Sequence, residues 1–163
     1  MNIIIREARI EDAYQKGFVH YTSWMETYDG LMPKEYLNRL KLETFIMIAE
    51  KYPENTLVVE VNGKIVGFAG YLEDASDFAS IKPASEIMAL YVLKDYQKKG
   101  IGYKLIKEAL NRLTKNNIVL FVLEGNTKAI NFYKKLGFNF TGHKVIRDVV
   151  GGKLIDLEML LER

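Results

Sequence analysis

The chain has 163 residues, of which 48% are hydrophobic and 27% are charged, and its formal net charge is +2. This length predicts one globular domain spanning residues 1–163, and so small a charge excess gives no reason to expect a nucleic-acid partner. The sequence contains no cysteine and only two histidines, which excludes disulfides, thiolate metal sites and an acyl-cysteine intermediate, and no metal site is expected.

The sequence also lacks membrane and export signals. No apolar run approaches the roughly 20 residues of a membrane span. Residues 1–6 carry neither the basic segment nor the cleavage pattern of a signal peptide. We therefore expect a cytoplasmic protein without a membrane partner.

The first half of the chain predicts a strand, two helices and a hairpin. Residues 3–6 are β-branched and apolar apart from Arg6, as in a strand. Helices are expected over 11–28 and over 33–51, where Pro33 suits a first helical turn. Strands over 56–61 and 64–72 flank Asn62-Gly63, a strong signal for a tight hairpin turn.

The second half predicts an alternation of strands and helices that closes in a hairpin. After a polar loop over 73–83, strands are expected over 85–93 and 118–123, with a helix over 102–116 between them. Asn126 can cap a helix that runs to Leu136 and stops at Gly137. Strands over 138–150 and 153–161 surround Gly151-Gly152. The order indicates a mixed α/β domain built around one sheet.

The most informative segment is the basic, glycine-containing turn that follows the 85–93 strand. Gln97-Lys98-Lys99-Gly100-Ile101-Gly102 leads directly into the next helix. Its glycines allow a tight turn and close approach of a ligand, and the exposed amides of a helix start favour a phosphate. A dinucleotide fingerprint is not met, because Leu105 stands where a third glycine is needed, and no Walker motif occurs.

Two motifs occur in this order along the second half of the chain. The segment 97–102 satisfies Gln/Arg-x-x-Gly-x-Gly/Ala, and residues 126–138 match Asn-x-x-Ala-x-x-Phe-Tyr-x-x-x-Gly-Phe. Together they resemble the GNAT superfamily of acetyl-CoA-dependent N-acetyltransferases. The resemblance extends over nearly the whole chain, because the order of elements and the closing hairpin also match. It implies a mixed α/β fold with a single, mostly antiparallel central sheet flanked by helices, in which the fourth strand splays away from the fifth.

The resemblance also implies how acetyl-CoA would be held. Backbone groups around Leu90, Tyr91 and Val92 would bind the pantetheine arm, and an amide near Leu90 would polarise the acetyl carbonyl. Asn126 would help to seat the cofactor, although it can equally be a plain helix cap. The pyrophosphate would lie in the turn and helix start, formed by Gln97, Lys98, Lys99, Gly100, Ile101, Gly102 and Tyr103.

The chemistry implied is direct attack of an amine on bound acetyl-CoA. Tyr133 would place its hydroxyl beside the leaving sulfur. An alkyl amine has a pKa near 10.4, so it needs a base. Glu86 is the candidate base, because in a regular strand it lies on the same face as Leu90, and Glu124 is the reserve candidate.

The acceptor stays open at this stage. His20, Trp24 and Tyr28 recur every four residues on one helix face, and Trp24 and Tyr28 are candidate acceptor-binding residues, although such a stripe also suits a core. A small amine or polyamine and a protein N-terminus or lysine are alternative acceptors. A non-catalytic acyl-CoA-binding sensor is the alternative from another functional class, and a homodimer is a further alternative to a monomer.

Overall fold

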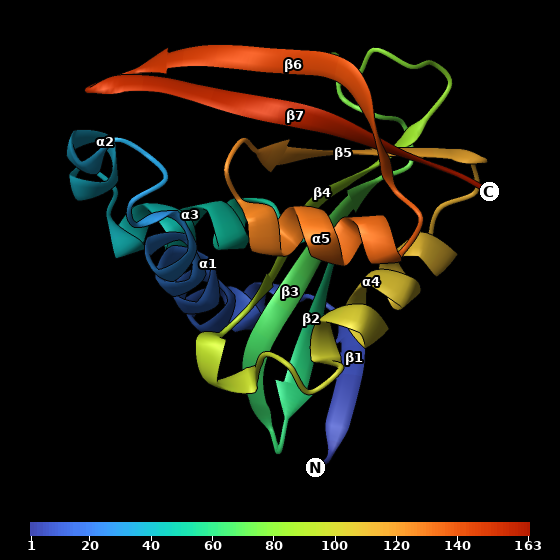
Figure 1. Cartoon of the computed structure of the whole chain (residues 1–163). Helices are drawn as coiled ribbons and strands as arrows, with labels where there is room; N and C mark the ends of the chain where they lie inside the picture. The colour runs from blue at the N-terminus through green and yellow to red at the C-terminus, as the bar shows by residue number, and fades with distance from the viewer.

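The computed structural model describes all 163 residues and forms one seven-stranded sheet with helices on both faces (Figure 1). Two short 3-10 turns, Ile10–Asp12 (η1) and Lys94–Tyr96 (η2), precede α1 and α4. The helices are α1 (Ala13–Tyr28), α2 (Lys34–Asn38), α3 (Leu42–Lys51), α4 (Ile101–Asn111) and α5 (Thr127–Lys135). The strands are β1 (Ile3–Glu7), β2 (Thr56–Val61), β3 (Lys64–Leu72), β4 (Ser85–Val92), β5 (Asn117–Leu123), β6 (Asn139–Val149) and β7 (Gly152–Glu162).

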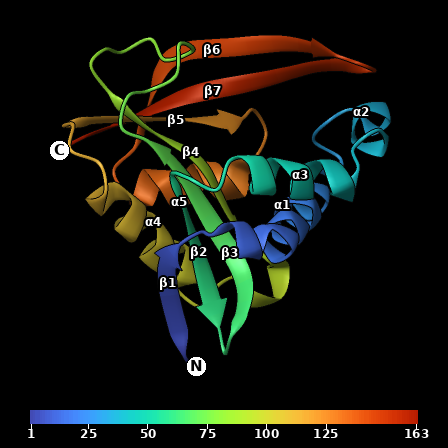
Figure 2. The same cartoon turned by 180° about the vertical axis from the view of Figure 1, so that it is seen from behind.

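The sheet has the order β1-β2-β3-β4-β5-β7-β6, and every neighbouring pair is antiparallel except β4 and β5. Helices α1 and α3 cover one face of the β2–β4 region, and α4 covers the other, as Figures 1 and 2 show together. Between these layers lies a core of 23 buried apolar residues, which includes Phe68, Leu105, Ile118 and Phe138. The predicted mixed, mostly antiparallel sheet is therefore confirmed.

The predicted helix over 33–51 is wrong as a single helix, since the chain forms α2 and α3 with a break between them. Lys41 is extended at φ −126° and ψ 139°. Leu37 of α2 is buried in one cluster with Leu123 and Leu154, whereas Phe45 of α3 contacts aromatic side chains of α1. Because the two segments bury side chains in different places, no single straight helix can serve both. Pro33 precedes α2 as its N-cap rather than lying inside it.

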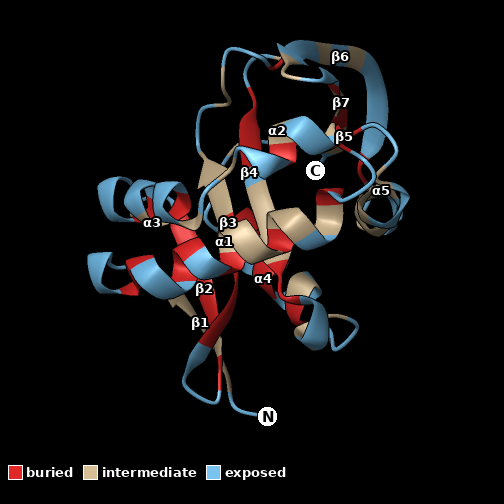
Figure 3. Cartoon of the chain, turned by 90° about the vertical axis from the view of Figure 1, so that its left-hand side faces the viewer, coloured by how far each residue is buried: buried red, intermediate tan, exposed pale blue.

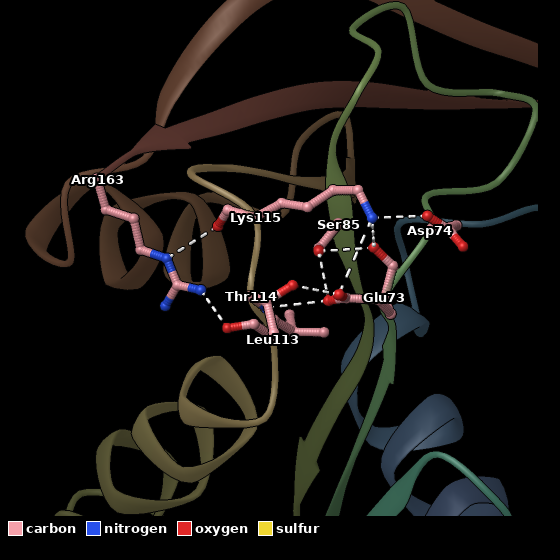
Figure 4. A network of polar contacts seen from close by, with 7 residues as sticks. All are labelled: Glu73, Asp74, Ser85, Leu113, Thr114, Lys115 and Arg163. Carbon is pink, nitrogen blue, oxygen red and sulfur yellow. Dashed lines mark hydrogen bonds and ion pairs between the residues drawn. The ribbon is translucent and has the colours of Figure 1, made fainter.

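The predicted helix over 102–116 begins one residue earlier, at Ile101, and ends at Asn111. The residues that follow Asn111 are hydrogen-bonded to a carboxylate of another loop instead of continuing the helix (Figure 4). The carboxylate of Glu73 accepts hydrogen bonds from the backbone N–H of Thr114 at 2.9 Å and from its hydroxyl. Lys115 extends the network by an ion pair with Asp74 at 2.6 Å. These bonds tie the loop after β3 to the chain that enters β5.

The loop over 73–84 is also held down over β7 by a fully buried carboxylate. Glu158 accepts hydrogen bonds from the backbone N–H and hydroxyl of Ser80, at 2.8 and 2.5 Å, and from the hydroxyl of Thr141 at 2.6 Å. Burial acts to raise the pKa of Glu158, but these hydrogen bonds outweigh it and the pKa lies below its ordinary value. By contrast, the outer strand β6 is largely exposed (Figure 3).

Lys16 of α1 is a buried cation without an acidic partner. It is 8% exposed, and its Nζ lies 4.3 Å from the centroid of the Phe68 ring. Burial lowers the pKa of Lys16 to about 8.

None of the helices combines the length and apolar character that crossing a membrane requires.

Candidate functional site

Strands β4 and β5 separate part-way along their length, as predicted from the family resemblance. They pair only where Ser85–Ile87 lie opposite Ile118–Leu120, while β4 stays paired with β3 as far as Val92 and β5 with β7 as far as Leu123. The N–H of Leu93 donates to Val66 of β3 at 2.9 Å. Since backbone groups alternate along a strand, those of Leu90 and Val92 point away from β3, toward the gap.

One of these backbone groups already has a partner. The side-chain Nε2 of Gln97 donates to the carbonyl of Val92 at 2.8 Å, and its Oε1 accepts from Lys128 Nζ at 2.5 Å. The carbonyl of Val92, one of the backbone groups expected to bind the pantetheine arm, is therefore already paired in this structure. Gln97 instead links the end of β4 to the first turn of α5, a contact that the sequence motif alone did not predict.

The turn into α4 presents a run of unused backbone donors. None of the amides from Lys98 to Tyr103 donates a hydrogen bond to a protein acceptor, and no side chain caps α4. Lys98 and Gly100 have φ of 61° and 79°, in the left-handed region, which turns the chain tightly before the helix. The side chains of Lys98 and Lys99 are exposed beside these amides. This arrangement suits a phosphate group.

Gly102 leaves room at the same place. A Cβ built on Gly102 would meet only the Phe132 ring, at 3.8 Å, and one on Gly100 would meet nothing within 4 Å. The protein itself therefore does not require a glycine at position 102. The open space lies where a ligand would approach the amides of α4.

Helix α5 begins and ends as the sequence predicted. Asn126 is its N-cap, and the side-chain Oδ1 accepts a hydrogen bond from the Ala129 amide at 3.4 Å. At the other end, the amides of Gly137 and Phe138 bond to the carbonyls of Lys134 and Tyr133, and Gly137 has a φ of 103°. These two hydrogen bonds form a Schellman motif, which fixes the C-terminal end of the helix that carries Tyr133.

Three aromatic side chains from α1 and β4 meet beside the gap, and Tyr133 of α5 lies near them. The hydroxyls of Tyr28 (α1) and Tyr91 (β4) are 2.8 Å apart and hydrogen-bonded. The Trp24 ring lies 5.0 Å from that of Tyr28, and its buried indole N–H has no hydrogen-bond partner. Tyr133 of α5 is near enough for its charge to affect Tyr91 and to be affected by Tyr28. The predicted stripe on α1 thus contacts the predicted strand residue Tyr91.

All three phenols at this point are held protonated. Burial, and then the proximity of Tyr28, raises the pKa of Tyr133 well above its ordinary value. Burial is also the largest cause of the raised pKa of Tyr91 and of Tyr28. His20, one turn earlier on α1, is neutral, because burial and then the charge of Lys16 lower its pKa to about 3. These groups can donate or accept hydrogen bonds but carry no charge near neutral pH.

The predicted relation between Glu86 and Leu90 fails, because β4 is not a regular strand. The register with β3 shifts between Gly70 and Tyr71, which leaves Met88 as an extra residue. Ile87 and Val92 consequently both face the main core. Glu86 is buried, and its carboxylate accepts from the Ser76 amide at 2.9 Å. Glu124, the reserve candidate, is half exposed and lies 3.7 Å from Lys144.

Sequence reasoning missed one carboxylate close to the aromatic cluster, that of Asp156 on β7. Asp156 lies opposite Leu123 in the sheet and forms an ion pair with Arg147 at 3.0 Å. Its charge adds to burial in raising the pKa of Tyr28. The signal was the pair of charged residues two positions apart, Asp156 and Glu158, in an otherwise apolar strand.

Comparison with known proteins gives consistent results. A family model described as the acetyltransferase (GNAT) family matches residues 18–138. The chain is 30% identical to a spermidine N(1)-acetyltransferase of Thermoplasma acidophilum, over 85% of this chain and 89% of that protein. It is also 30% identical to the peptidyl-lysine N-acetyltransferase YjaB of Salmonella typhimurium, over 91% and 92%. The crystal structure of the PaiA N-acetyltransferase from Thermoplasma acidophilum in complex with coenzyme A superposes with a TM-score of 0.71, at 25% identity over the full length of both chains.

Proposed function

This chain belongs to the acetyltransferase (GNAT) family and is an acetyltransferase, and from this premise we propose that it acetylates a primary amine with acetyl-CoA by direct attack in a ternary complex. The observation that carries the proposal is the unused amides from Lys98 to Tyr103, which lie next to the open side of β4. The coenzyme A in the Thermoplasma structure supports the same donor here. Acetyl-CoA supplies the activated acetyl group.

The residues of the chain fit the two ends of such a donor. The amides from Lys98 to Tyr103, aided by the two exposed lysine side chains, would bind the pyrophosphate. Leu90 would offer its N–H to the acetyl carbonyl, because this group faces the gap and not β3. Asn126, while capping α5, would help to seat the pantetheine arm.

Tyr133 is the proposed hydrogen-bond donor to the leaving sulfur. Its hydroxyl forms no hydrogen bond within the chain, and its raised pKa keeps the proton on it. A thiol has a pKa near 8.5, so the departing thiolate needs a hydrogen bond and not complete proton transfer. A protonated phenol held on a capped helix suits this role.

The amine must lose a proton before it attacks. At neutral pH, deprotonation of an alkyl amine costs roughly 4–5 kcal/mol. Glu86 is the proposed base, acting through a water because the shift in β4 turns its side chain away from that of Leu90. Glu124 is the alternative. Trp24 and Tyr28 are proposed to bind the acceptor.

The test separates catalysis from binding alone. Release of free coenzyme A is followed with wild-type protein over a panel of monoamines, polyamines and short peptides, and coenzyme A binding is measured by calorimetry. Turnover on an amine supports the proposal. Tight coenzyme A binding without turnover on any amine would instead support a non-catalytic sensor.

Two substitutions at Gly102 form a matched pair that tests the proposed pyrophosphate site. Gly102→Ala adds a methyl group that the structure accommodates and improves the helix, whereas Gly102→Glu puts a carboxylate beside the amides. We expect near-normal coenzyme A affinity for the first and at least a tenfold loss for the second. Equal affinities would exclude this helix start as the pyrophosphate site.

A further inference from the structure

The connection between α1 and α2, residues 29–33, closes the outer end of the aromatic site. A Cβ built on Gly125, in the turn after β5, would lie 3.5 Å from Leu31. Met32 is buried in one cluster with Tyr28 and Leu154. The connection thus contacts the end of β5 and the strand β7 at the same time.

The same connection contacts the tip of the β6–β7 hairpin, and Figure 1 shows α2 directly beside that tip. A Cβ on Gly151 would lie 3.2 Å from the Pro33 Cβ and 3.3 Å from the Glu35 Cβ, and one on Gly152 would lie 3.1 Å from Pro33. The two segments are therefore in van der Waals contact. An extended peptide has no space to lie between them, which favours a small acceptor.

Asp156 supplies a negative charge beside the cluster that contains Tyr28. It is two residues from Leu154 on β7, so both side chains project from the same face of the sheet. Leu154 is buried in one cluster with Tyr28, and Leu123, opposite Asp156 in the register, belongs to the same cluster. The Asp156 side chain is 20% exposed, and Arg147 is its only ion-pair partner.

This charge suits a cation that does not react. A carboxylate next to the attacking nitrogen would favour the ammonium form and so oppose attack. The same carboxylate would bind a second ammonium group elsewhere on the acceptor without that cost. The rings of Trp24 and Tyr28, 5.0 Å apart, add surfaces on which a cation is stabilised.

We infer that Asp156 anchors the second, non-reacting ammonium group of a small di- or polyamine, in a site closed by the contact of Pro33 with Gly151 and Gly152. This inference rests on the proposed function and names its acceptor class. Arg147 would compete with the ammonium group for Asp156, since its guanidinium forms an ion pair with that carboxylate at 3.0 Å. The Arg147 side chain is 47% exposed. An arriving ammonium would displace it into solvent.

The test compares butane-1,4-diamine with butylamine, which differ by one charge, using KM and kcat for each. We expect Asp156→Asn to raise the KM for the diamine at least tenfold with kcat within twofold, and to change the KM for butylamine less than twofold. Arg147→Gln frees Asp156 and is expected to lower the diamine KM by twofold to fivefold. Asp148→Asn breaks an exposed ion pair with Lys153 on the same two strands and serves as the control, with no change.

Binding of the diamine to the protein with coenzyme A, measured by calorimetry, separates the two proposals. Binding that Asp156→Asn abolishes supports the anchor even where no turnover occurs, a result that contradicts only the proposed catalysis. The anchor is overturned if the diamine does not bind to the wild-type protein, if Asp156→Asn raises both KM values equally, or if short peptides are the better substrates.

Discussion

The hydroxyl of Tyr28 on α1 is hydrogen-bonded to the hydroxyl of Tyr91 on β4, at 2.8 Å. This bond joins the helix that lines the proposed acceptor site to the strand proposed to align the thioester. Trp24 packs on one side of it, and Asp156 places its charge nearby. In the proposed complex, this one contact would couple the position of the acceptor to that of the acetyl group.

Replacing Tyr28 with Phe removes this bond while keeping the ring. A neutral hydrogen bond of this kind contributes about 0.5–1.5 kcal/mol, and we expect a loss of that size in the free energy of unfolding, measured in urea. The KM for the amine should rise several-fold. Tyr36→Phe is the control, since Tyr36 packs at the same cluster and its hydroxyl forms no hydrogen bond. Equal effects of the two substitutions would contradict a specific role for the Tyr28–Tyr91 bond.

Replacing Tyr133 with Phe tests the donor to the leaving sulfur. Loss of one preorganised donor typically costs about 10²–10³ in kcat, and we expect a fall in this range with the coenzyme A affinity retained. Kinetics and calorimetry on the same preparation measure the two quantities. Tyr14→Phe, at an exposed tyrosine of α1, should change neither. Unchanged turnover in Tyr133→Phe would refute the assignment.

Glu86→Gln distinguishes the two candidate bases. The glutamine oxygen can still accept from the Ser76 amide, so the loop should stay in place and the melting temperature should change little. We expect kcat/KM to fall about 10²-fold. Glu124→Gln, measured in parallel, should leave kcat/KM unchanged. The reverse pattern would transfer the role of base to Glu124.

Lys16→Met is expected to stabilise the protein at neutral pH. The folded-state pKa of Lys16 is about 8, below the 10.5 of the unfolded chain, so its protonated form is disfavoured in the folded state. A shift of this size corresponds to about 3 kcal/mol, and we expect a gain of roughly 1–3 kcal/mol because the contact of the ammonium with the Phe68 ring is lost.

The stability gain of Lys16→Met should depend on pH. Between pH 8 and 10.5 the unfolded chain binds more protons at Lys16, so wild-type stability rises with pH in that window. The advantage of Lys16→Met should therefore be full below pH 8 and vanish above pH 10.5. Urea unfolding at pH 7 and pH 10.5 measures both limits. A gain that is the same at the two pH values would show that Lys16 acts through packing alone.

The strands, the turns and the residues of the two motifs could be predicted from the sequence because their signals are local. Asn62-Gly63 and the Asn126 and Gly137 boundaries depend on a few neighbouring residues. The break in the 33–51 helix could not be predicted, since it depends on where Leu37 and Phe45 pack. The bond between Gln97 and Val92 and the place of Asp156 depend on strand register, which the sequence alone does not specify.

The three paired positions between β4 and β5 have a mechanical consequence. They are the only strand pairing between the β1–β4 part of the sheet and the β5–β7 part. A bound molecule that bridges the two strands would stiffen the whole sheet as an extra strand does. Protection of the Leu90 and Val92 amides from deuterium exchange would then depend on occupancy, while the tightly paired β2–β3 hairpin would exchange slowly in either state.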